Sequence, residues 1–100
     1  MTHTLVRMTV LETIRAKLDA AFSPSHLDVR DDSAKHAGHA GAREGGETHF
    51  HVAIVSKMFE GLTRVDRHRR VHDVLDAELK GRVHALALTL LTPDEAAHRM

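Results

Sequence analysis

The sequence contains no cysteine, no tryptophan and no tyrosine among its 100 residues. Without cysteine, the chain by itself can form no disulfide, no zinc–cysteine site and no reactive thiol. The 14 lysines and arginines balance the 14 aspartates and glutamates, so the formal net charge is zero. A generic nucleic-acid-binding protein usually carries a basic excess. This chain has no such excess overall.

Long apolar runs are also absent. No stretch reaches the roughly eighteen apolar residues that a membrane span needs. The opening sequence "MTHTLVRMTV" lacks the apolar core of a signal peptide. We therefore expect a cytoplasmic protein that does not cross a membrane. One hundred residues, of which 42% are hydrophobic, fit a single domain over residues 1–100 with one modest core.

Three segments carry helix signals. A capping box, in which a threonine is followed three residues later by a glutamate, opens both 9–22 and 92–100. Between them, residues 61–81 predict one long helix, with Thr63 and Asp66 near its start and Gly81 after its end. We therefore expect one helix near each end of the sequence and one long helix between them.

Three other segments predict strands. Residues 26–31 alternate apolar and polar side chains, which is typical of a short half-buried strand. Residues 48–56, "THFHVAIVS", give the clearest strand, with Phe50 on the face expected to be buried. Residues 82–92 predict a third strand that is apolar on both faces. The glycine-rich stretch 38–46 predicts the loop between the first two strands.

These elements predict an α+β fold. The first two strands can form a hairpin, and the long helix then crosses over to the third strand. A crossover of this kind normally makes its flanking strands parallel and is right-handed. We therefore expect a three-stranded mixed sheet covered by helices on one face.

The sequence resembles the BolA family from the first predicted helix to Pro93. The most specific pieces are "GETHF", "VS" followed by "FEGL", "RHR" and "VHAL". The resemblance implies a fold similar to the class II KH domain, in the order α-β-β-α-α-β. It also implies binding and not catalysis, because family members partner monothiol glutaredoxins and share a [2Fe–2S] cluster with them. We therefore expect a non-enzyme that is monomeric alone and forms a heterodimer with a glutaredoxin.

The resemblance also implies the cluster ligands. "VHAL" carries the family's cluster histidine, which is His84 here. His36 matches the position of the second ligand, and His39 competes with it three residues later in the same glycine-rich loop. Histidine is an acceptable iron ligand in [2Fe–2S] centres. Because this chain has no thiolate, the remaining ligands would be a glutaredoxin cysteine and a glutathione.

Four other histidines occur in pairs that suit a metal less well. His49 and His51 share one strand face, but a zinc site needs about four ligands, or three and a water. We interpret His51 as part of a solvated face and His49 as structural. His68 and His72 stand one helical turn apart, a spacing that can bind metal, although no third ligand is evident beside them. We interpret His68 as a half-buried, hydrogen-bonded residue.

A nucleic-acid-binding role is the alternative. Five basic side chains near the long helix can contact phosphates: Lys57, Arg64, Arg67, Arg69 and Arg70. Interleaved aspartates cancel much of their field, so a solvated helix face explains them equally well. The string "GHAG" at 38–41 matches the GXXG loop with which KH domains grip nucleic acid, but it lies in the wrong connection. The alternative function is therefore a DNA-binding transcriptional regulator.

Overall fold

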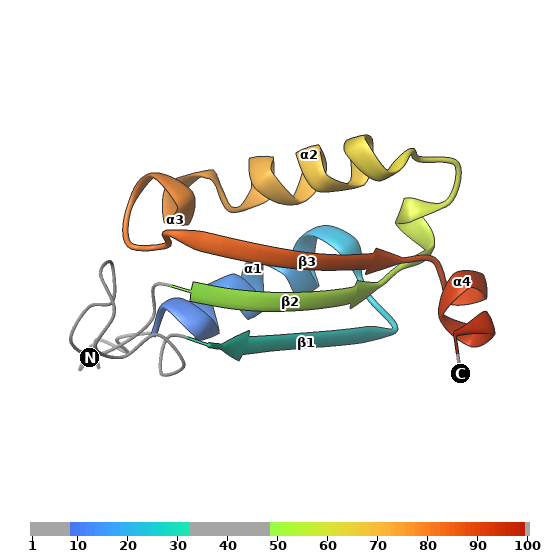
Figure 1. The fold of residues 1–100 in the computed structure, drawn as a ribbon, viewed down its shortest axis with the longest axis horizontal. Coiled ribbons are helices and arrows are strands. Elements are labelled where there is room, and N and C mark those ends of the chain that lie inside the picture. The colour runs from blue at the N-terminus through green and yellow to red at the C-terminus, as the bar shows by residue number, and fades with distance from the viewer. Residues whose placement is uncertain (1–8, 33–48, 100) are drawn as a thin grey trace, which may run out of the picture.

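A computed structural model describes residues 9–32 and 49–99 of the chain. Helices and strands follow one another in an α-β-β-α-α-β order, with a short 3-10 turn after the second strand and a short helix at the end (Figure 1). The elements are α1 (Val10–Phe22), β1 (His26–Asp31), β2 (His49–Val55), η2 (Lys57–Phe59), α2 (Arg64–Val74), α3 (Asp76–Lys80), β3 (Ala85–Leu91) and α4 (Pro93–His98).

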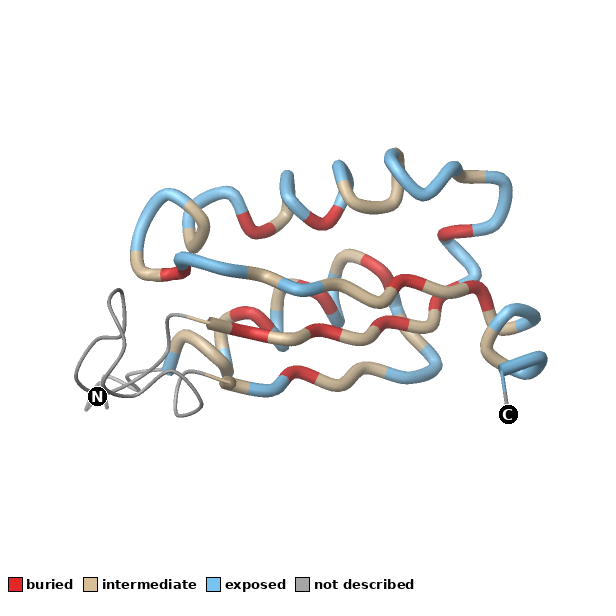
Figure 2. Tube along the Cα trace, viewed as in Figure 1, coloured by how far each residue is buried: buried red, intermediate tan, exposed pale blue. Residues whose placement is uncertain are grey.

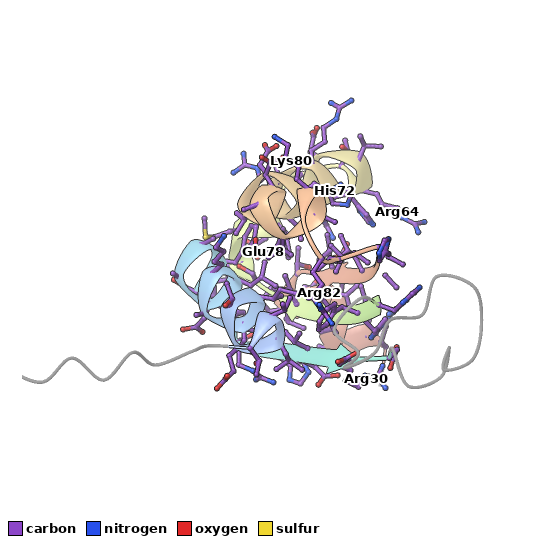
Figure 3. The ribbon with its side chains drawn as sticks, turned by 90° about the vertical axis from the view of Figure 1, so that its left-hand side faces the viewer. Arg30, Arg64, His72, Glu78, Lys80 and Arg82 are labelled. Carbon is purple, nitrogen blue, oxygen red and sulfur yellow. The ribbon has the colours of Figure 1, made fainter. Side chains whose placement is uncertain are left out.

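The three strands form one mixed sheet in the order β1-β2-β3. β1 pairs antiparallel with β2, whereas β3 pairs parallel with β2, in a register that places His49 opposite Ala85. The helices α1 and α2 pack on one face of this sheet (Figures 1 and 3). The predicted α+β fold, with its parallel crossover through the central helical segment, is confirmed.

The two predicted capping boxes form as expected. At the start of α1, the Thr9 hydroxyl accepts from the Glu12 N–H at 3.1 Å, and the Glu12 carboxylate accepts from the Thr9 N–H at 2.8 Å. Thr92 and Glu95 repeat both bonds at the start of α4, with the same two distances. Each box satisfies N–H groups that have no partner inside the helix, and so it fixes where the helix begins.

The single helix predicted over 61–81 is wrong in its bounds. The structure has two helices, α2 and α3, which meet at Leu75, where the backbone leaves the helical region (φ −100°, ψ 19°). Leu75 is only 1% exposed, so its side chain anchors the bend in the core. After this bend, α3 makes an ion pair with α1 through Lys17 and Glu78, at 2.8 Å between Nζ and Oε2. Tertiary packing therefore divides a sequence whose local propensity is continuously helical.

The core lies between the sheet and the helices, and the buried segments of Figure 2 follow it along β2, α1 and α2. From β2, the alternate residues Phe50, Val52 and Ile54 are all buried, as their spacing predicts. Phe59 from η2 is fully buried and packs against Phe22, with ring centroids 5.1 Å apart. Burial of this apolar surface is the main driving force for the fold.

Ser56 explains the "VS" motif that precedes "FEGL". Its side chain is buried, donates to the Phe22 carbonyl at 2.7 Å and accepts from the Met58 N–H at 3.1 Å. Its own N–H donates to the Leu91 carbonyl at 2.9 Å. One small polar residue therefore ties the end of α1, the end of β3 and the start of η2 together. This is a structural role, since every polar group of the residue is engaged inside the protein.

Candidate functional site

The strongest candidate site lies at the end of the sheet where β2 and β3 begin. Because these strands are parallel, their first residues stand side by side. His49 opens β2 and His84 precedes β3, and their imidazole rings are 6.4 Å apart between centroids, with planes 29° from parallel. β1, which runs antiparallel, ends at the same edge with Asp31. The structure therefore brings two imidazoles to one end of the sheet.

The turn from α3 into β3 sets the position of His84. The Gly81 N–H donates to the Ala77 carbonyl at 3.1 Å, and the Val83 N–H donates to the Glu78 carbonyl at 3.1 Å. The Val83 side chain is 5% exposed and therefore fixed in the core, whereas His84 is exposed. His84 thus directly follows a buried residue on a hydrogen-bonded turn, and it is itself exposed.

The bounds of the predicted strand differ from the structure at this point. The strand was predicted over 82–92, but the β3 ladder begins at Ala85, so His84 precedes the strand. Leu86, Leu88 and Leu90 are buried or half-buried, whereas His84, just before the ladder, is exposed.

His51 is committed to a contact that excludes it from this site. It lies on β2 directly across from Arg30 of β1, and Arg30 Nη2 is 2.9 Å from His51 Nδ1. A guanidinium can only donate, so Nδ1 accepts and Nε2 carries the ring proton. The only in-plane lone pair of the neutral imidazole is therefore already engaged by Arg30. This geometry agrees with the interpretation of His51 as part of a polar sheet face.

The predicted loop ligands His36 and His39 lie outside the described residues. The residues that flank this segment are described, and they are bonded to each other: the Asp32 N–H donates to the His49 carbonyl at 2.8 Å. The segment therefore leaves and re-enters the described structure at the end of the sheet where His84 lies.

The donor set at this end of the sheet is small. Among residues 9–32 and 49–99, no group of three or more histidine, aspartate or glutamate side chains is arranged to hold a metal ion. The 100-residue sequence supplies no cysteine. A four-ligand centre therefore needs donors in addition to those that the described residues present here.

Within residues 9–32 and 49–99, no helix has the length and apolarity required to cross a membrane.

Arg67, one of the predicted phosphate contacts, is engaged inside the protein. Its guanidinium donates to the Leu62 carbonyl at 3.2 Å, to the Leu90 carbonyl at 3.1 Å and to the Glu95 carboxylate at 2.6 Å. It also lies 5.9 Å from the centre of the Phe59 ring. Only 12% of its side chain is exposed. This clamp, which joins α2, β3 and α4, was missed by the sequence analysis, because Glu95 stands 28 residues away in the chain.

The other predicted basic contacts do not share a face. Lys57, Arg64, Arg69 and Arg70 are all exposed. At 100° per residue, the three exposed arginines of α2 (Arg64, Arg69 and Arg70) point in directions that are between roughly 100° and 140° apart around the helix. Arg69 also lies 4.0 Å from the Asp66 carboxylate. The structure therefore gives no single basic stripe on α2, which is what a phosphate backbone would track.

Comparison with known proteins agrees with this architecture. The family model described as BolA-like protein matches residues 18–95. BolA-like protein 1 of Mus musculus is 52% identical over 80 residues, which cover 80% of this chain and 56% of that protein. The DNA-binding transcriptional regulator BolA of Haemophilus influenzae is 36% identical over 88 residues, covering 88% of this chain and 82% of that protein.

A solved structure shows the same fold. The BolA domain of SufE1 from Arabidopsis thaliana superposes with a TM-score of 0.79 at 42% sequence identity, covering 90% of this chain and 99% of that one. The chain spans about half the length of the mouse relative that it matches. A family match over residues 18–95 and relatives of this similarity place the sequence unambiguously: the chain belongs to the BolA-like protein family.

Proposed function

We propose that this protein binds a [2Fe–2S] cluster together with a monothiol glutaredoxin, with His84 as its fixed ligand. The observation that carries the proposal is an exposed histidine on a hydrogen-bonded turn, in a chain with no thiolate. Imidazole suits iron in such centres, where two histidines can replace two cysteines on one iron. A thiolate-bearing partner then has to supply the rest of the shell.

Chain length supports a second ligand from the segment that contains His36 and His39. An extended chain spans at most about 3.6 Å per residue. His36, four residues after Asp32, therefore lies within about 14 Å of it, and His39 lies within about 25 Å. Asp32 is bonded to His49, whose ring lies 6.4 Å from that of His84. Either loop histidine is thus within reach of the His84 end of the sheet.

Reconstitution with a monothiol glutaredoxin, iron, sulfide and glutathione tests the proposal. We expect His84→Ala to abolish the histidine-ligated visible absorption and circular dichroism bands of the heterodimer. His36→Ala should weaken the cluster less, because His39 can replace it, and the double change of both loop histidines should match His84→Ala. Acid should weaken every form, because a metal-bound imidazole must lose its proton from the ligating nitrogen.

His98→Ala is the matched control. His98 is an exposed histidine on α4, at the opposite end of the sheet from His84 (Figure 1), and its substitution should leave the spectrum unchanged. An unaltered cluster spectrum with His84→Ala, in a heterodimer that still forms, would refute the assignment. In that case the glutaredoxin would hold the cluster without this chain.

DNA binding is a second candidate, because the H. influenzae relative is named as a DNA-binding transcriptional regulator. If the exposed arginines bind phosphates, duplex affinity should fall with salt by about 0.9 log units per log unit of salt for each contact. Replacing Arg64 and Arg70 with alanine should then flatten that slope in a salt titration of a labelled duplex. Arg67 is unsuitable for this test because it is a structural clamp. Salt-insensitive binding would leave the arginines as a solvated surface.

The cytoplasmic location stays a prediction. Two relatives from Arabidopsis thaliana carry organelle names, SufE-like protein 1 being called chloroplastic/mitochondrial and BOLA1 chloroplastic. Fractionation of source cells with an antibody to the chain would test the location.

We propose for this chain a binding role without catalysis, in which the His84 end of the sheet is the docking site for the glutaredoxin.

A further inference from the structure

Two histidines that the cluster site does not use lie on the outer side of α2. His68 and His72 are one turn apart, and at 100° per residue they point only about 40° away from each other around the helix. Together with four neighbours they line one shallow hollow along the helix: Arg64, Val65, Arg69 and Asp73. In Figure 3, Arg64 and His72 lie on the side of α2 that faces away from α1. Two imidazoles therefore border one accessible surface.

The hydrogen bond of His68 fixes which ring nitrogen is available. His68 Nδ1 lies 2.8 Å from the Arg64 carbonyl oxygen. A carbonyl can only accept, so Nδ1 carries the proton and donates, and the lone pair of the ring is on Nε2. Histidines that bind metals typically donate their other N–H to a backbone carbonyl or carboxylate in this way. His68 is thus already in the tautomer that a metal ligand needs.

His72 has no hydrogen-bond or ion-pair partner among the described residues and is exposed. Helical side chains lean toward the N-terminus, which directs the ring of His72 back toward His68. Side chains four residues apart on a helix have Cβ atoms about 5–6 Å apart, a separation that lets two imidazoles reach one ion. The same spacing supplies two metal ligands in helical zinc motifs.

We propose that His68 and His72 chelate a divalent transition-metal ion that favours imidazole, such as Ni²⁺, Cu²⁺ or Zn²⁺, with water completing its shell. This site is separate from the cluster ligands, since neither histidine belongs to that set. The Arg64 and Arg69 cations border the same hollow and repel a metal cation. Among the residues that line the hollow, only Asp73 carries a negative charge that offsets this repulsion. Binding through two protein ligands in this field is reversible and weak, unlike a closed structural site.

Nickel titration followed by histidine-ring NMR tests the proposal on the full chain. Paramagnetic Ni²⁺ should broaden the ring signals of His68 and His72 together, at one common metal concentration. The matched variant combines His72→Ala with Arg70→His, which keeps ten histidines and leaves Asp73 in place but moves the second ring to about 160° from His68. Because this variant cannot chelate the ion through both rings, broadening of the His68 ring signals should require at least about tenfold more Ni²⁺.

Both altered positions of this variant are exposed, so the fold is retained, and an unchanged thermal unfolding curve verifies it. A second variant, Arg64→Gln, keeps both imidazoles and the backbone carbonyl and removes a cation, so it should bind Ni²⁺ at least as tightly as the wild type. Equal Ni²⁺ affinity at His68 in the wild type and the spacing variant would overturn the proposal. Absence of joint broadening in the wild type, or weaker binding with Arg64→Gln, would also overturn it.

Discussion

Phe59→Ala is expected to lower the free energy of unfolding by about 4 kcal/mol. The Phe59 ring is fully buried, packs against Phe22 at 5.1 Å and has the Arg67 guanidinium 5.9 Å from its centre. Truncation removes apolar area that is out of water and leaves a cavity that the surrounding helices and sheet cannot fill by small shifts. Urea denaturation of the two proteins, followed by far-UV circular dichroism, measures the difference.

Met58→Ala is the matched control for this loss. Met58 is the preceding residue of the same 3-10 turn, but it is 48% exposed, so its truncation should change stability by no more than about 0.5 kcal/mol. A domain of this size has only about 5–15 kcal/mol of stability, so Phe59→Ala should bring the chain close to its unfolding threshold. A loss below 1 kcal/mol would show that the core closes around the missing ring.

The elements of this fold are predictable where the signal is local. The capping boxes at Thr9 and Thr92 fix two helix starts to the residue, because a cap depends only on side chains three positions apart. The alternation of Phe50, Val52 and Ile54 predicts the buried face of β2, because a strand buries every second residue. The parallel arrangement of β2 and β3 follows from the crossover rule, and it is confirmed.

Features that depend on distant residues were not predictable in this way. Nothing in "HDVLDAE" breaks a helix, yet α2 ends at Leu75, whose side chain is buried in the core. Five basic residues of similar type form one group in the sequence, yet the structure separates Arg67 from the others. Its partners at Leu90 and Glu95 are more than twenty residues away, so local pattern cannot distinguish a clamp from a solvated cation.

The candidate site likewise combines features that the local sequence predicts with features that depend on distant residues. The "VHAL" motif identifies His84, and the structure adds that the residue is exposed on a turn fixed by Val83 and by the α3 carbonyls. The strand begins at Ala85, three residues later than the predicted 82–92, so His84 lies before the β3 ladder and not within it. The proximity of His49 to His84 has no local signal either, since 35 residues separate them and only the parallel register of β2 and β3 brings them together.

Arg67→Ala is expected to lower the free energy of unfolding by about 2 kcal/mol near neutral pH, since it removes charged hydrogen bonds of which part is solvent-exposed. The Leu62 and Leu90 carbonyls lose their donor, and the Glu95 carboxylate loses its cation. Arg67→Lys should recover little of this loss. A lysine ammonium lacks the planar fork that serves two carbonyls and a carboxylate at once.

The same clamp predicts how stability depends on acid. The Arg67 guanidinium, and next the Thr92 N–H, lower the pKa of Glu95 from its ordinary 4.5 to about 2. A carboxylate whose pKa is lower in the folded state stabilises the fold fully above pH 4.5. That contribution is lost as the pH falls from about 4.5 toward 2, where Glu95 takes up its proton in the folded protein.

Unfolding free energies of the wild type and Arg67→Ala, measured in urea between pH 7 and pH 2, test this dependence. Below about pH 4.5 the wild type should lose stability more steeply, so that the two curves converge in acid. Glu12→Gln is the control, because the Thr9 N–H lowers the pKa of Glu12 also, but at the far end of the chain from the clamp. When Glu12→Gln is combined with Arg67→Ala, the loss of unfolding free energy in acid should become smaller again, by an amount that is independent of the clamp. Parallel curves for the wild type and Arg67→Ala from pH 4.5 to pH 2 would contradict the clamp as the cause of the lowered Glu95 pKa.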